Sequence, residues 1–364
     1  MMQVAMTGGD GFLGWHTRCA LLAQGTLARD IPVGGYYSAD QARSAVDGSD
    51  RYIHLAGVNR GTDLEVETGN ILFADQAAQA LRAATYPPSV VVYANSIQAS
   101  LDNTYGRAKT RVAEILATAA IDIGAQFIDM KLPNQFGEHG RPFYNAVTST
   151  FCHIIAQGGV PDVIDDKALT LMHAQDAADL LIGNSSPDVM LSLTRQVMVS
   201  ELRDKLQTIA QCYEHGDIPD VSDDFSRNLF NTYRSYSPSL AIGFELIPRS
   251  DDRGRFFEVM RSHGGRGQVS FFTTAPGASR GQYFHRRKIE RLVVLAGQAI
   301  IEMRRCGTSD TASIAASSEC PVAVDIPTMW THKITNTGND PLYTASWTNG
   351  PFDPVVPDTT TEAV

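Results

Sequence analysis

A short apolar segment that runs straight into a glycine-rich turn constrains the fold of this chain more than any other feature. Residues 3–6 have the pattern of a buried strand, and an apolar-periodic helical pattern continues to about residue 24. Gly8, Gly11 and Gly14 lie between the two, at a wider spacing than in the G-x-G-x-x-G turn. Glycines here let the backbone approach a pyrophosphate, and the following helix N-terminus stabilises its negative charge. The pattern predicts a dinucleotide site; the alternative is a glycine-rich turn without a ligand.

Two further strand patterns fit the same sheet. Residues 51–55 end at the Ala-Gly pair 56–57, residues 90–93 end just before Ser96, and a helical pattern over residues 70–84 separates them. Strands that alternate with helices predict a parallel, doubly wound α/β sheet of the Rossmann type, with ligand at the carboxyl ends of the strands. The glycine turn, the Ala-Gly pair and Ser96 would then meet along one edge of one sheet.

Tyr105 and Lys109 follow Ser96 closely and are four residues apart. On a helix this spacing puts both side chains on one face. A protonated Lys beside a phenol favours the phenolate, so we expect the pKa of Tyr105 to be lowered toward neutrality, where general acid–base catalysis is most efficient. Ser96 would hold a carbonyl or alkoxide oxygen in place. The alternative is that Tyr105 and Lys109 are two surface residues at helical spacing.

Composition narrows the class of protein further. A length of 364 residues suggests two domains. The formal net charge of −10 argues against a nucleic-acid surface, and no run approaches the ~18 apolar residues of a membrane span. No secretory signal pattern precedes the glycine turn. The cysteines are odd in number, scattered and without metal-ligand spacing: Cys19, Cys152, Cys212, Cys306 and Cys320. We expect a reduced, cytoplasmic protein that binds neither nucleic acid nor membrane.

Taken together, these motifs resemble an extended short-chain dehydrogenase/reductase (SDR). The resemblance lies in the turn at residues 8–14, the His-Leu-Ala-Gly sequence 54–57, Asn70, Ser96 and the pair Tyr105 and Lys109. It implies hydride transfer between a nicotinamide and a sugar carbon, with Tyr105 as acid/base and Ser96 orienting the substrate carbonyl. It also implies that Lys109 binds the nicotinamide ribose and lowers the Tyr pKa, and that Asn70 holds a proton-relay water.

The same resemblance assigns the cofactor-binding residues. The Lys-Leu-Pro-Asn segment at residues 131–134 resembles the part of the family that packs near nicotinamide and substrate. The set that the resemblance implies is Gly8, Gly11, Phe12, Leu13, Gly14, Leu55, Ala56, Gly57, Asn70, Tyr105, Lys109, Pro133 and Asn134.

The choice of cofactor depends on the strand after the first helix. We expect this strand to end near residues 36–38, about 20 residues past the glycine turn, where NAD-binding proteins place an Asp or Glu on the ribose 2′-OH. No acidic residue stands there, and Asp40 lies beyond. Arg18 on the first helix is a candidate partner for a 2′-phosphate. We therefore expect NADPH as the cofactor, with NADH as the alternative.

A narrower resemblance concerns one subfamily, the bifunctional reductase/epimerases that make UDP-2-acetamido-2,6-dideoxy-L-talose on the route to N-acetyl-L-fucosamine of bacterial capsules. The similar segments are His54–Arg60, Ser96–Ala99, Asp102-Asn103, Tyr144-Asn145 and Thr150–Cys152. Those proteins carry a cupin domain after the reductase domain. The second half of this chain fits, because short strand patterns separated by turn residues indicate an all-β barrel or jelly roll. These patterns cover residues 271–273, 292–295, 299–303, 322–326 and 343–347.

The composition of the chain changes near Ser235–Pro238. We therefore predict an NAD(P)-binding extended SDR domain with its substrate lobe over residues 1–240, a cupin domain over residues 241–355 and a flexible C-terminal tail over residues 356–364. Residues 195–237 are mostly polar and helical in pattern. They would complete the substrate lobe, or form only a solvated helical surface.

The cupin motifs are present but altered. The first motif of the family has two His one residue apart and then a Glu; here His285 and Glu290 are in register, but Tyr283 stands where the first His belongs. The second motif keeps its His at His332, with Met329 where a Gly is usual. Two His and one carboxylate can hold a transition metal. His285, Glu290 and His332 are therefore candidate ligands of a divalent metal such as zinc, and a hydrogen-bonded cluster without metal is the alternative.

A second cupin family is also similar. The segments Asp251–Glu258 and Arg280-Gly281 resemble the metal-free 3,5-epimerases of nucleotide 4-keto-6-deoxyhexoses. In that family a His soon after the Arg-Gly pair is the base that removes a proton beside the ketone, and the corresponding position is again Tyr283. The cupin is then either a weakened or lost C3 epimerase, or a domain kept for dimerisation or for shaping a site.

The sequence predicts an NADPH-dependent enzyme that reduces C4 of a nucleotide-linked 4-keto-6-deoxy sugar, with or without a 2-acetamido group. Catalysis is predicted at Tyr105, Lys109 and Ser96, in a homodimer formed through the cupin domain. One alternative is a fully bifunctional C3 epimerase/C4 reductase, and another is a non-catalytic dinucleotide sensor joined to a sugar-binding cupin. A third is an SDR-type epimerase or dehydratase, but Leu101 and Asp102 do not supply the acid/base groups that it needs.

Overall fold

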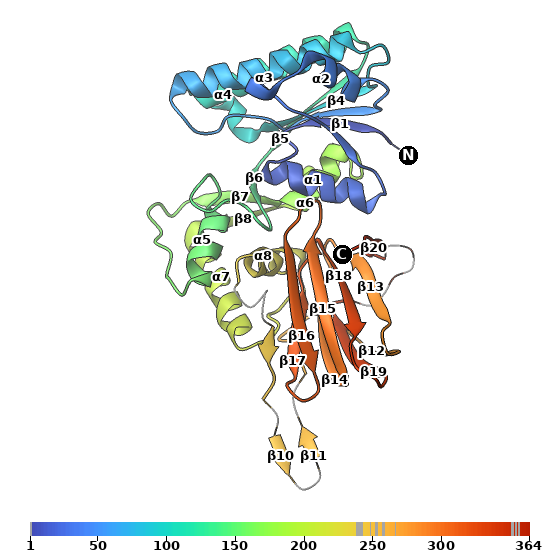
Figure 1. The fold of residues 1–364 in the computed structure, drawn as a ribbon. Helices are drawn as coiled ribbons and strands as arrows, with labels where there is room; N and C mark the ends of the chain where they lie inside the picture. The colour runs from blue at the N-terminus through green and yellow to red at the C-terminus, as the bar shows by residue number, and fades with distance from the viewer. Residues whose placement is uncertain are drawn as a thin grey trace. The chain divides into compact units, whose positions relative to one another are not determined.

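The computed structural model describes residues 2–237, 243–247, 249–251, 254–256, 259–265, 267–350, 353, 355 and 357–364 (Figure 1). By packing, the chain divides into two compact units. The first consists of Met1–Phe136 and Ala168–Val197, and the second of Gly137–Lys167 and Met198–Val364. The predicted division after residue 240 follows composition rather than packing and stays a prediction. Pro238, in its boundary segment, lies outside the described residues.

A parallel five-stranded sheet forms the centre of the first unit, in the strand order β2-β1-β3-β4-β5. The strands are β1 (Val4–Thr7), β2 (Ala28–Ile31), β3 (Arg51–His54), β4 (Val90–Ser96) and β5 (Gln126–Leu132). Successive residues of β1, β3 and β4 are buried, as expected of a parallel sheet that is covered on both faces. The predicted doubly wound α/β fold is confirmed.

Helices cover both faces of this sheet (Figure 1). Tyr52, Val91 and Tyr93 of the sheet pack in one core with α2 (Ala39–Val46), α3 (Asp63–Ala83) and α4 (Thr104–Asp122). Val4, Ile53 and Val92 pack in the other core with α1 (Phe12–Ala23) and α6 (Ala174–Ile182). A second, three-stranded sheet has the order β6 (Asn134–Phe136), β7 (Ala168–His173) and β8 (Thr194–Met198). Single 3₁₀ segments are η1 (Gly34–Tyr36), η2 (Ile97–Ser100) and η3 (Pro187–Leu193).

The end of β2 differs from the prediction. β2 ends at Ile31 and not near residues 36–38. Pro32 follows and has no N–H for the sheet ladder, and Gly34 at φ +70° begins η1. Asp30 is therefore the acidic residue at the strand end, and the prediction that no acid stands there is wrong.

Side-chain caps fix where two helices of the first unit begin. The hydroxyl of Thr62 accepts from Glu65 N at the start of α3, and the Glu65 carboxylate accepts from Thr62 N in return. Asn103 Oδ1 accepts from Gly106 N at 2.8 Å and begins α4. Tyr105 consequently lies in the first turn of α4.

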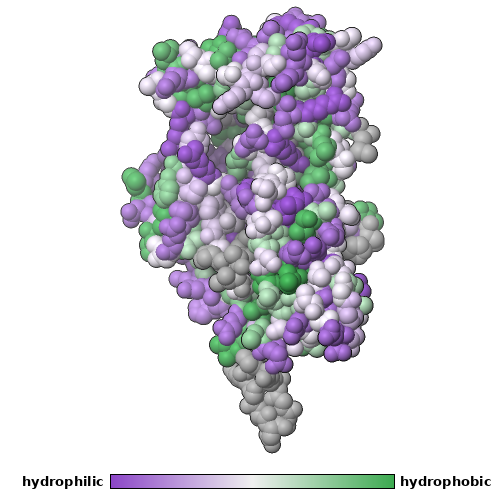
Figure 2. All heavy atoms as spheres, viewed as in Figure 1, coloured by the Kyte–Doolittle hydropathy of each residue, from purple (hydrophilic) through white to green (hydrophobic). Residues whose placement is uncertain are grey.

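The second unit contains three helices among its described residues: α5 (Val147–Ala156), α7 (Val199–Glu214) and α8 (Asp224–Arg234). A buried carboxylate joins α7 to the β-structure, because Asp325 accepts hydrogen bonds from Tyr213 Oη at 2.8 Å and Arg291 Nε at 2.6 Å. Across the part of the chain that is described, no helix is both long and apolar enough to cross a bilayer. The face seen in Figure 2 shows polar and apolar side chains intermixed.

Two antiparallel five-stranded sheets make up most of the second unit, in the orders β12-β19-β14-β17-β9 and β16-β15-β18-β13-β20. Their strands are β9 (Phe244–Glu245), β12 (Gln268–Thr274), β13 (Ser279–Phe284), β14 (Glu290–Ala296), β15 (Gln298–Arg305), β16 (Thr311–Ser317), β17 (Val322–Ile326), β18 (Trp330–Asn336), β19 (Leu342–Thr348) and β20 (Thr360–Thr361). A separate hairpin pairs β10 (Arg249–Asp251) with β11 (Gly254–Phe256). The buried core draws Leu292 and Val324 from one sheet and Ile301 and Ile334 from the other. The predicted all-β cupin-like architecture is confirmed.

The C-terminal residues are not a flexible tail. Thr360 and Thr361 pair with Phe284 and Tyr283 as strand β20. The Asp358 carboxylate accepts three backbone N–H groups, from residues 286, 287 and 288, at 3.1, 3.0 and 2.7 Å. A short segment without a hydrophobic pattern is therefore held by the sheet edge and by one carboxylate, which the sequence pattern does not reveal.

We predict that Asp358→Ala destabilises the turn at residues 286–288. Three backbone donors lose their acceptor, so the free energy of unfolding should fall by about 2–4 kcal/mol. Hydrogen–deuterium exchange should be faster at the amides of residues 286–288 in this variant. Asp340→Ala, at an exposed loop position, is the matched control. Exchange at this turn that is equal in the two variants would contradict the proposed role of the carboxylate.

Candidate active site

The glycine turn brings the end of β1 against the end of β3. Gly8 has φ +72°, and a Cβ on it would lie 2.6 Å from Ala56 N. A Cβ on Gly14 would lie 2.1 Å from Gly8 O. Helix α1 begins at Gly11 without a side-chain cap and without an acidic residue in its first turn. The first N–H groups of α1, from Phe12 onward, are thus free of competing side-chain anions, which suits a phosphate.

Arg18 and Asp30 lie over this turn. A Cβ on Gly9 would meet Asp30 Oδ1 at 2.1 Å and Arg18 at 2.8 Å. Arg18 donates to Asp30 Oδ2 at 2.5 Å and to Asp10 Oδ1 at 3.0 Å. The predicted partner of a 2′-phosphate is therefore already held by two carboxylates. The carboxylate at the end of β2 is in the position from which NAD-binding proteins contact the ribose.

The loop after β3 is fixed by Asn70. The Asn70 side-chain amide donates to Val58 O at 2.7 Å and to Val66 O at 2.6 Å, and its carbonyl accepts from Val58 N at 3.2 Å. These contacts hold Leu55, Ala56 and Gly57 in place at the sheet edge. The Asn70 side chain is thus hydrogen-bonded to backbone groups. Its predicted role in holding a relay water stays a prediction.

The structure brings Ser96, Tyr105 and Lys109 together. Ser96 is the last residue of β4, and its side chain is near enough to the Tyr105 hydroxyl to act on the pKa of that phenol. Lys109 lies one turn after Tyr105 on α4, is 5% exposed, and has its Nζ 5.6 Å from the centre of the Tyr105 ring. A Cβ on Gly57 would lie 3.4 Å from that Nζ. The predicted catalytic group is therefore adjacent to the loop that follows β3.

The protonation of this group differs from the expectation. Burial raises the pKa of Tyr105, against the lowering effect of Ser96. Burial lowers the pKa of Lys109 to about 8. The expected lowering of the Tyr105 pKa is therefore wrong, because the phenol is buried. A protonated phenol is nevertheless the form that donates a proton to a ketone oxygen.

The remaining predicted cofactor residues lie at the same sheet edge. Phe12 and Leu13 begin α1, next to the glycine turn. Pro133 and Asn134 follow β5, whose last residue, Leu132, pairs with Ser96. All these residues belong to the first unit. The residues chosen from scattered motifs thus converge on the carboxyl ends of adjacent parallel strands.

A second polar cluster lies inside the cupin sheets and centres on the Glu290 carboxylate. His285 Nε2 is 3.2 Å and His332 Nε2 is 3.5 Å from Glu290 Oε2. Ser346 donates to Glu290 Oε1 at 3.0 Å, and the centre of the Tyr283 ring lies 5.2 Å from that of His285 and 4.6 Å from that of His332. The sequence predicts three members of the cluster, and the structure adds Ser346 and places Tyr283 beside the two His side chains.

The pKa shifts in this cluster do not favour a side chain that could remove a proton from a substrate at neutral pH. Burial opposes ionisation, but hydrogen bonds and charges from His285 and His332 hold the pKa of Glu290 below its usual value. Burial lowers the pKa of His332 to about 4. Burial, followed by the charge of Glu290, raises the pKa of the Tyr283 phenol. His285 Nδ1 donates to Asp358 O at 2.5 Å, so the C-terminal segment fixes this imidazole.

The predicted metal site receives no support. Within the described ranges, no group of three or more His, Cys, Asp or Glu side chains is arranged to hold a metal ion. His285, Glu290 and His332 meet, but through imidazole–carboxylate contacts of the kind that make a hydrogen-bonded cluster. The resemblance to metal-free epimerases rests partly on residues 252, 253, 257 and 258, which lie outside the described residues.

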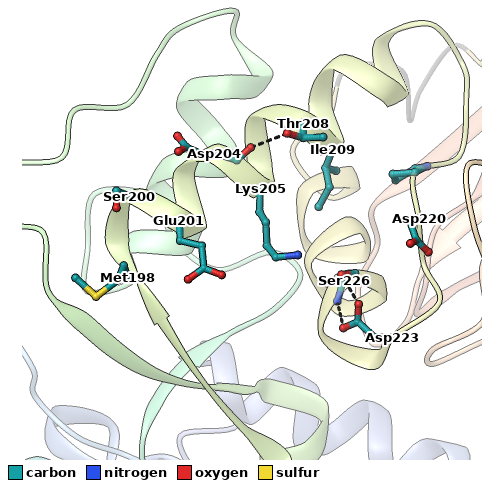
Figure 3. A pocket seen from close by; sticks show the side chains of 11 residues that line it. Met198, Ser200, Glu201, Asp204, Lys205, Thr208, Ile209, Asp220, Asp223 and Ser226 are labelled. Carbon is teal, nitrogen blue, oxygen red and sulfur yellow. Dashed lines mark hydrogen bonds between the residues drawn. The ribbon is translucent and has the colours of Figure 1, made fainter.

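A separate cavity of about 620 Å³ lies between α7 and α8 (Figure 3). Lys205 is surrounded there by carboxylates, and Asp223 is held by Ser226 N at 3.0 Å. Its lining residues are Met198, Ser200, Glu201, Asp204, Lys205, Thr208, Ile209, Pro219, Asp220, Asp223 and Ser226. None of them belongs to the predicted catalytic, cofactor or metal sets.

Comparisons with known proteins decide the family. A family model described as the polysaccharide biosynthesis C-terminal domain matches residues 249–360. The UDP-2-acetamido-2,6-beta-L-arabino-hexul-4-ose reductase of Pseudomonas aeruginosa is 32% identical over 367 residues, which cover 98% of this chain and 98% of that protein. The chain belongs to the family of this reductase. It is therefore an oxidoreductase, and the predicted resemblance to the UDP-sugar reductase/epimerases of capsules is confirmed.

Solved structures of the same type cover the whole chain. The crystal structure of the capsular polysaccharide assembling protein CapF from Staphylococcus aureus is similar at a TM-score of 0.62 and 31% identity, over 100% of both chains. A second CapF structure, with the inhibitor 3-isopropenyl-tropolone, has a TM-score of 0.55 and 28% identity over 100% of both chains. Both units of the present chain thus have counterparts in one known protein.

Proposed function

We propose that this protein reduces the C4 ketone of a UDP-linked 4-keto-6-deoxy sugar, with a 2-acetamido group at C2, using a nicotinamide dinucleotide. The observation that carries the proposal is the meeting of Ser96, Tyr105 and Lys109 next to Gly57. The name of the Pseudomonas aeruginosa relative, a hexul-4-ose reductase, supports a ketone at C4 of the substrate. A non-catalytic dinucleotide sensor would not need a buried, protonated phenol beside a buried ammonium group.

The residues at the glycine turn fit such a cofactor. The close approach of Gly8 to Ala56 and the uncapped start of α1 leave backbone N–H groups for a pyrophosphate. The proposed cofactor-binding residues are Gly8, Gly11, Phe12, Leu13, Gly14, Leu55, Ala56, Gly57, Asn70, Tyr105, Lys109, Pro133 and Asn134. When bound, the cofactor supplies the hydride that C4 receives.

The chain's own residues orient the ketone, supply the proton and stabilise the charge that develops during the reaction. Ser96 donates a hydrogen bond to the ketone oxygen and orients it. Tyr105 transfers its proton to that oxygen as the C4–H bond forms, since its raised pKa keeps the phenol protonated at neutral pH. The Lys109 ammonium binds the nicotinamide ribose and stabilises the phenolate that remains.

We propose that the cupin contributes little or no C3 epimerase activity. Removal of the C3 proton requires a free base, and Glu290 already accepts hydrogen bonds on both oxygens. Tyr283 has a raised pKa, so its phenol is in the wrong protonation state for a base at pH 7. The observation that favours the alternative, a fully bifunctional enzyme, is the 3.2 Å contact of His285 Nε2 with the Glu290 carboxylate, since a carboxylate can orient an imidazole that acts as a base.

We further propose a cytoplasmic homodimer formed through the cupin domain. All five cysteines are free, which suits a reducing compartment. Val269 and Phe271, on the edge strand β12, are 71% and 61% exposed, and the Phe271 ring lies 5.9 Å from that of Tyr343. An exposed apolar edge strand is a surface that a second copy can cover.

The role of Tyr105 is tested by Tyr105→Phe. The substitution keeps the ring and the helix but removes the proton, so kcat for reduction of the 4-keto UDP-sugar should fall by about 10²–10⁴. Binding of the dinucleotide should be nearly unchanged. Turnover is measured as the loss of absorbance of the reduced nicotinamide. Near-native turnover by this variant would mean that another group supplies the proton.

Cofactor choice is tested at Asp30. We propose NADPH, bound at its 2′-phosphate by Arg18; NADH is the alternative, because Asp30 at the end of β2 competes for Arg18. Asp30→Asn should then tighten NADPH binding by about ten-fold, the effect of ~1.4 kcal/mol of charge repulsion. Asp10→Asn, which removes the more exposed partner of Arg18, is the control and should change the affinity less. Tighter binding of NADH than of NADPH by the unmodified protein would overturn the proposed preference.

Epimerase activity is tested by deuterium incorporation at C3 of the 4-keto UDP-sugar in D₂O, without cofactor. We predict weak or no exchange for the unmodified protein. Tyr283→His, which restores the family's imidazole, should increase the exchange. Rapid exchange by the unmodified protein that is lost in His332→Ala would instead establish the bifunctional enzyme.

A further inference from the structure

Tyr93 is a buried phenol with an unexplained hydroxyl. It lies in β4, three residues before Ser96, and is 1% exposed within the core that α3 and α4 form with the sheet. Its hydroxyl has no hydrogen-bond partner among the residues that the structure describes. A buried tyrosine hydroxyl normally finds a partner, and an unpaired one is unfavourable. The hydroxyl therefore gives no reason for the residue at this position, and a role for it has to lie in the contacts of its ring.

The Tyr93 ring faces the ammonium group of Lys109. The distance from Lys109 Nζ to the centre of the Tyr93 ring is 5.2 Å, and to that of the Tyr105 ring 5.6 Å. Gly57 and Asn70 close a further side, since a Cβ on Gly57 would lie 3.4 Å from Nζ and 3.0 Å from Asn70 Oδ1. No salt bridge of Lys109 is found in the described part of the chain, and burial is the cause of its lowered pKa.

We propose that Tyr93 is a positioning residue, whose ring forms with that of Tyr105 a two-tyrosine cage that keeps Lys109 as an ammonium ion beside the proton donor. The inference rests on the proposed reductase function, in which Lys109 acts as a cation. Aromatic faces attract a cation, and the attraction is stronger where water is excluded. The cage offsets part of the penalty of burying a charge without a carboxylate partner.

The other groups around Lys109 contribute less to stabilising its charge than the two tyrosine rings do. From β3, His54 faces it; burial and then the charge of Lys109 lower the pKa of His54 to about 3, so this imidazole is neutral. Tyr105 lies on the same helix, and Ser96 at the end of β4. Burial, and then Tyr105 and Asp129 of β5, raise the pKa of the Tyr93 phenol. Lys109 has a pKa of about 8, so it loses its charge as the pH rises through this value, and cofactor binding and reduction should fall there.

The test compares Tyr93→Leu, which removes the ring, with Tyr93→Phe, which keeps it. Tyr93→Met is a second ring-free variant in case the leucine packs badly. Phe127→Leu removes an aromatic ring from the same core on the neighbouring strand and is the packing control. Three readouts are followed against pH: kcat/KM for reduction, the Kd of the dinucleotide, and the NMR titration of ¹³C-labelled Lys109.

In Tyr93→Leu and Tyr93→Met we expect the pKa of Lys109 in the NMR titration to fall by about one pH unit, a ten-fold shift in the ionisation constant. The loss of kcat/KM and of dinucleotide binding at alkaline pH should shift to lower pH by the same amount. Both the pKa and this loss should stay in place in Tyr93→Phe and Phe127→Leu. A Lys109 titration that does not move in the ring-free variants would overturn the cage, and so would an equal shift in Tyr93→Phe. If the unmodified protein reduces no 4-keto UDP-sugar, the proposed function fails, whereas the NMR titration still decides on the cage.

Discussion

The first unit depends on one constraint, a buried ammonium ion that has no carboxylate partner among the described residues. Lys109 is almost fully enclosed, and taking an unpaired charge out of water is costly. Its position is set by the helix start at Asn103, which fixes the register of α4, and by the strand that ends at Ser96. A side chain at residue 57 would intrude on the same space, which explains a glycine there. The glycine turn, the β3 loop and α4 therefore have to be in place together.

The second unit has the opposite electrostatic arrangement. There a buried carboxylate, Glu290, is contacted by the side chains of His285, His332 and Ser346. A fully satisfied carboxylate is stable and weakly basic. The first unit thus holds a proton donor whose proton is available, while the second holds an acceptor that is already in use. This contrast supports the proposal that the first unit carries out reduction and that the second contributes little epimerisation.

The sequence was sufficient for the features that depend on local pattern. Strand, glycine turn and helix at residues 3–24 predicted the parallel sheet, and the four-residue spacing of Tyr105 and Lys109 predicted their common face. The end of β2 was predicted wrongly, because Pro32 and Gly34 end the strand earlier than the spacing rule implies. The raised pKa of Tyr105 depends on its burial, which no local pattern encodes.

Contacts between distant segments account for the rest. Asp358 caps residues 286–288 from some seventy positions away, and a short polar terminus gives no pattern that predicts this. Tyr93 looks like any core residue of a buried strand, and only its distance to Lys109 distinguishes it. Asp30 and Arg18 meet over the glycine turn because β2, which comes after α1 in the chain, pairs in parallel with β1. Its last residues therefore lie beside the end of β1, where the turn begins.

In the proposed reaction, hydride passes directly from the nicotinamide to C4 of the sugar, and the proton comes from Tyr105. It is tested most directly with NADPH that carries deuterium on one face of its nicotinamide C4, each face in a separate reaction, and a UDP-linked 4-keto-6-deoxy sugar. NMR of the product should show deuterium at the sugar C4 from one face only, and in that reaction in a one-to-one ratio with the oxidised cofactor. Oxidised cofactor without deuterium at the sugar C4 in both reactions, or a reduced sugar that carries solvent hydrogen at C4, would contradict the account.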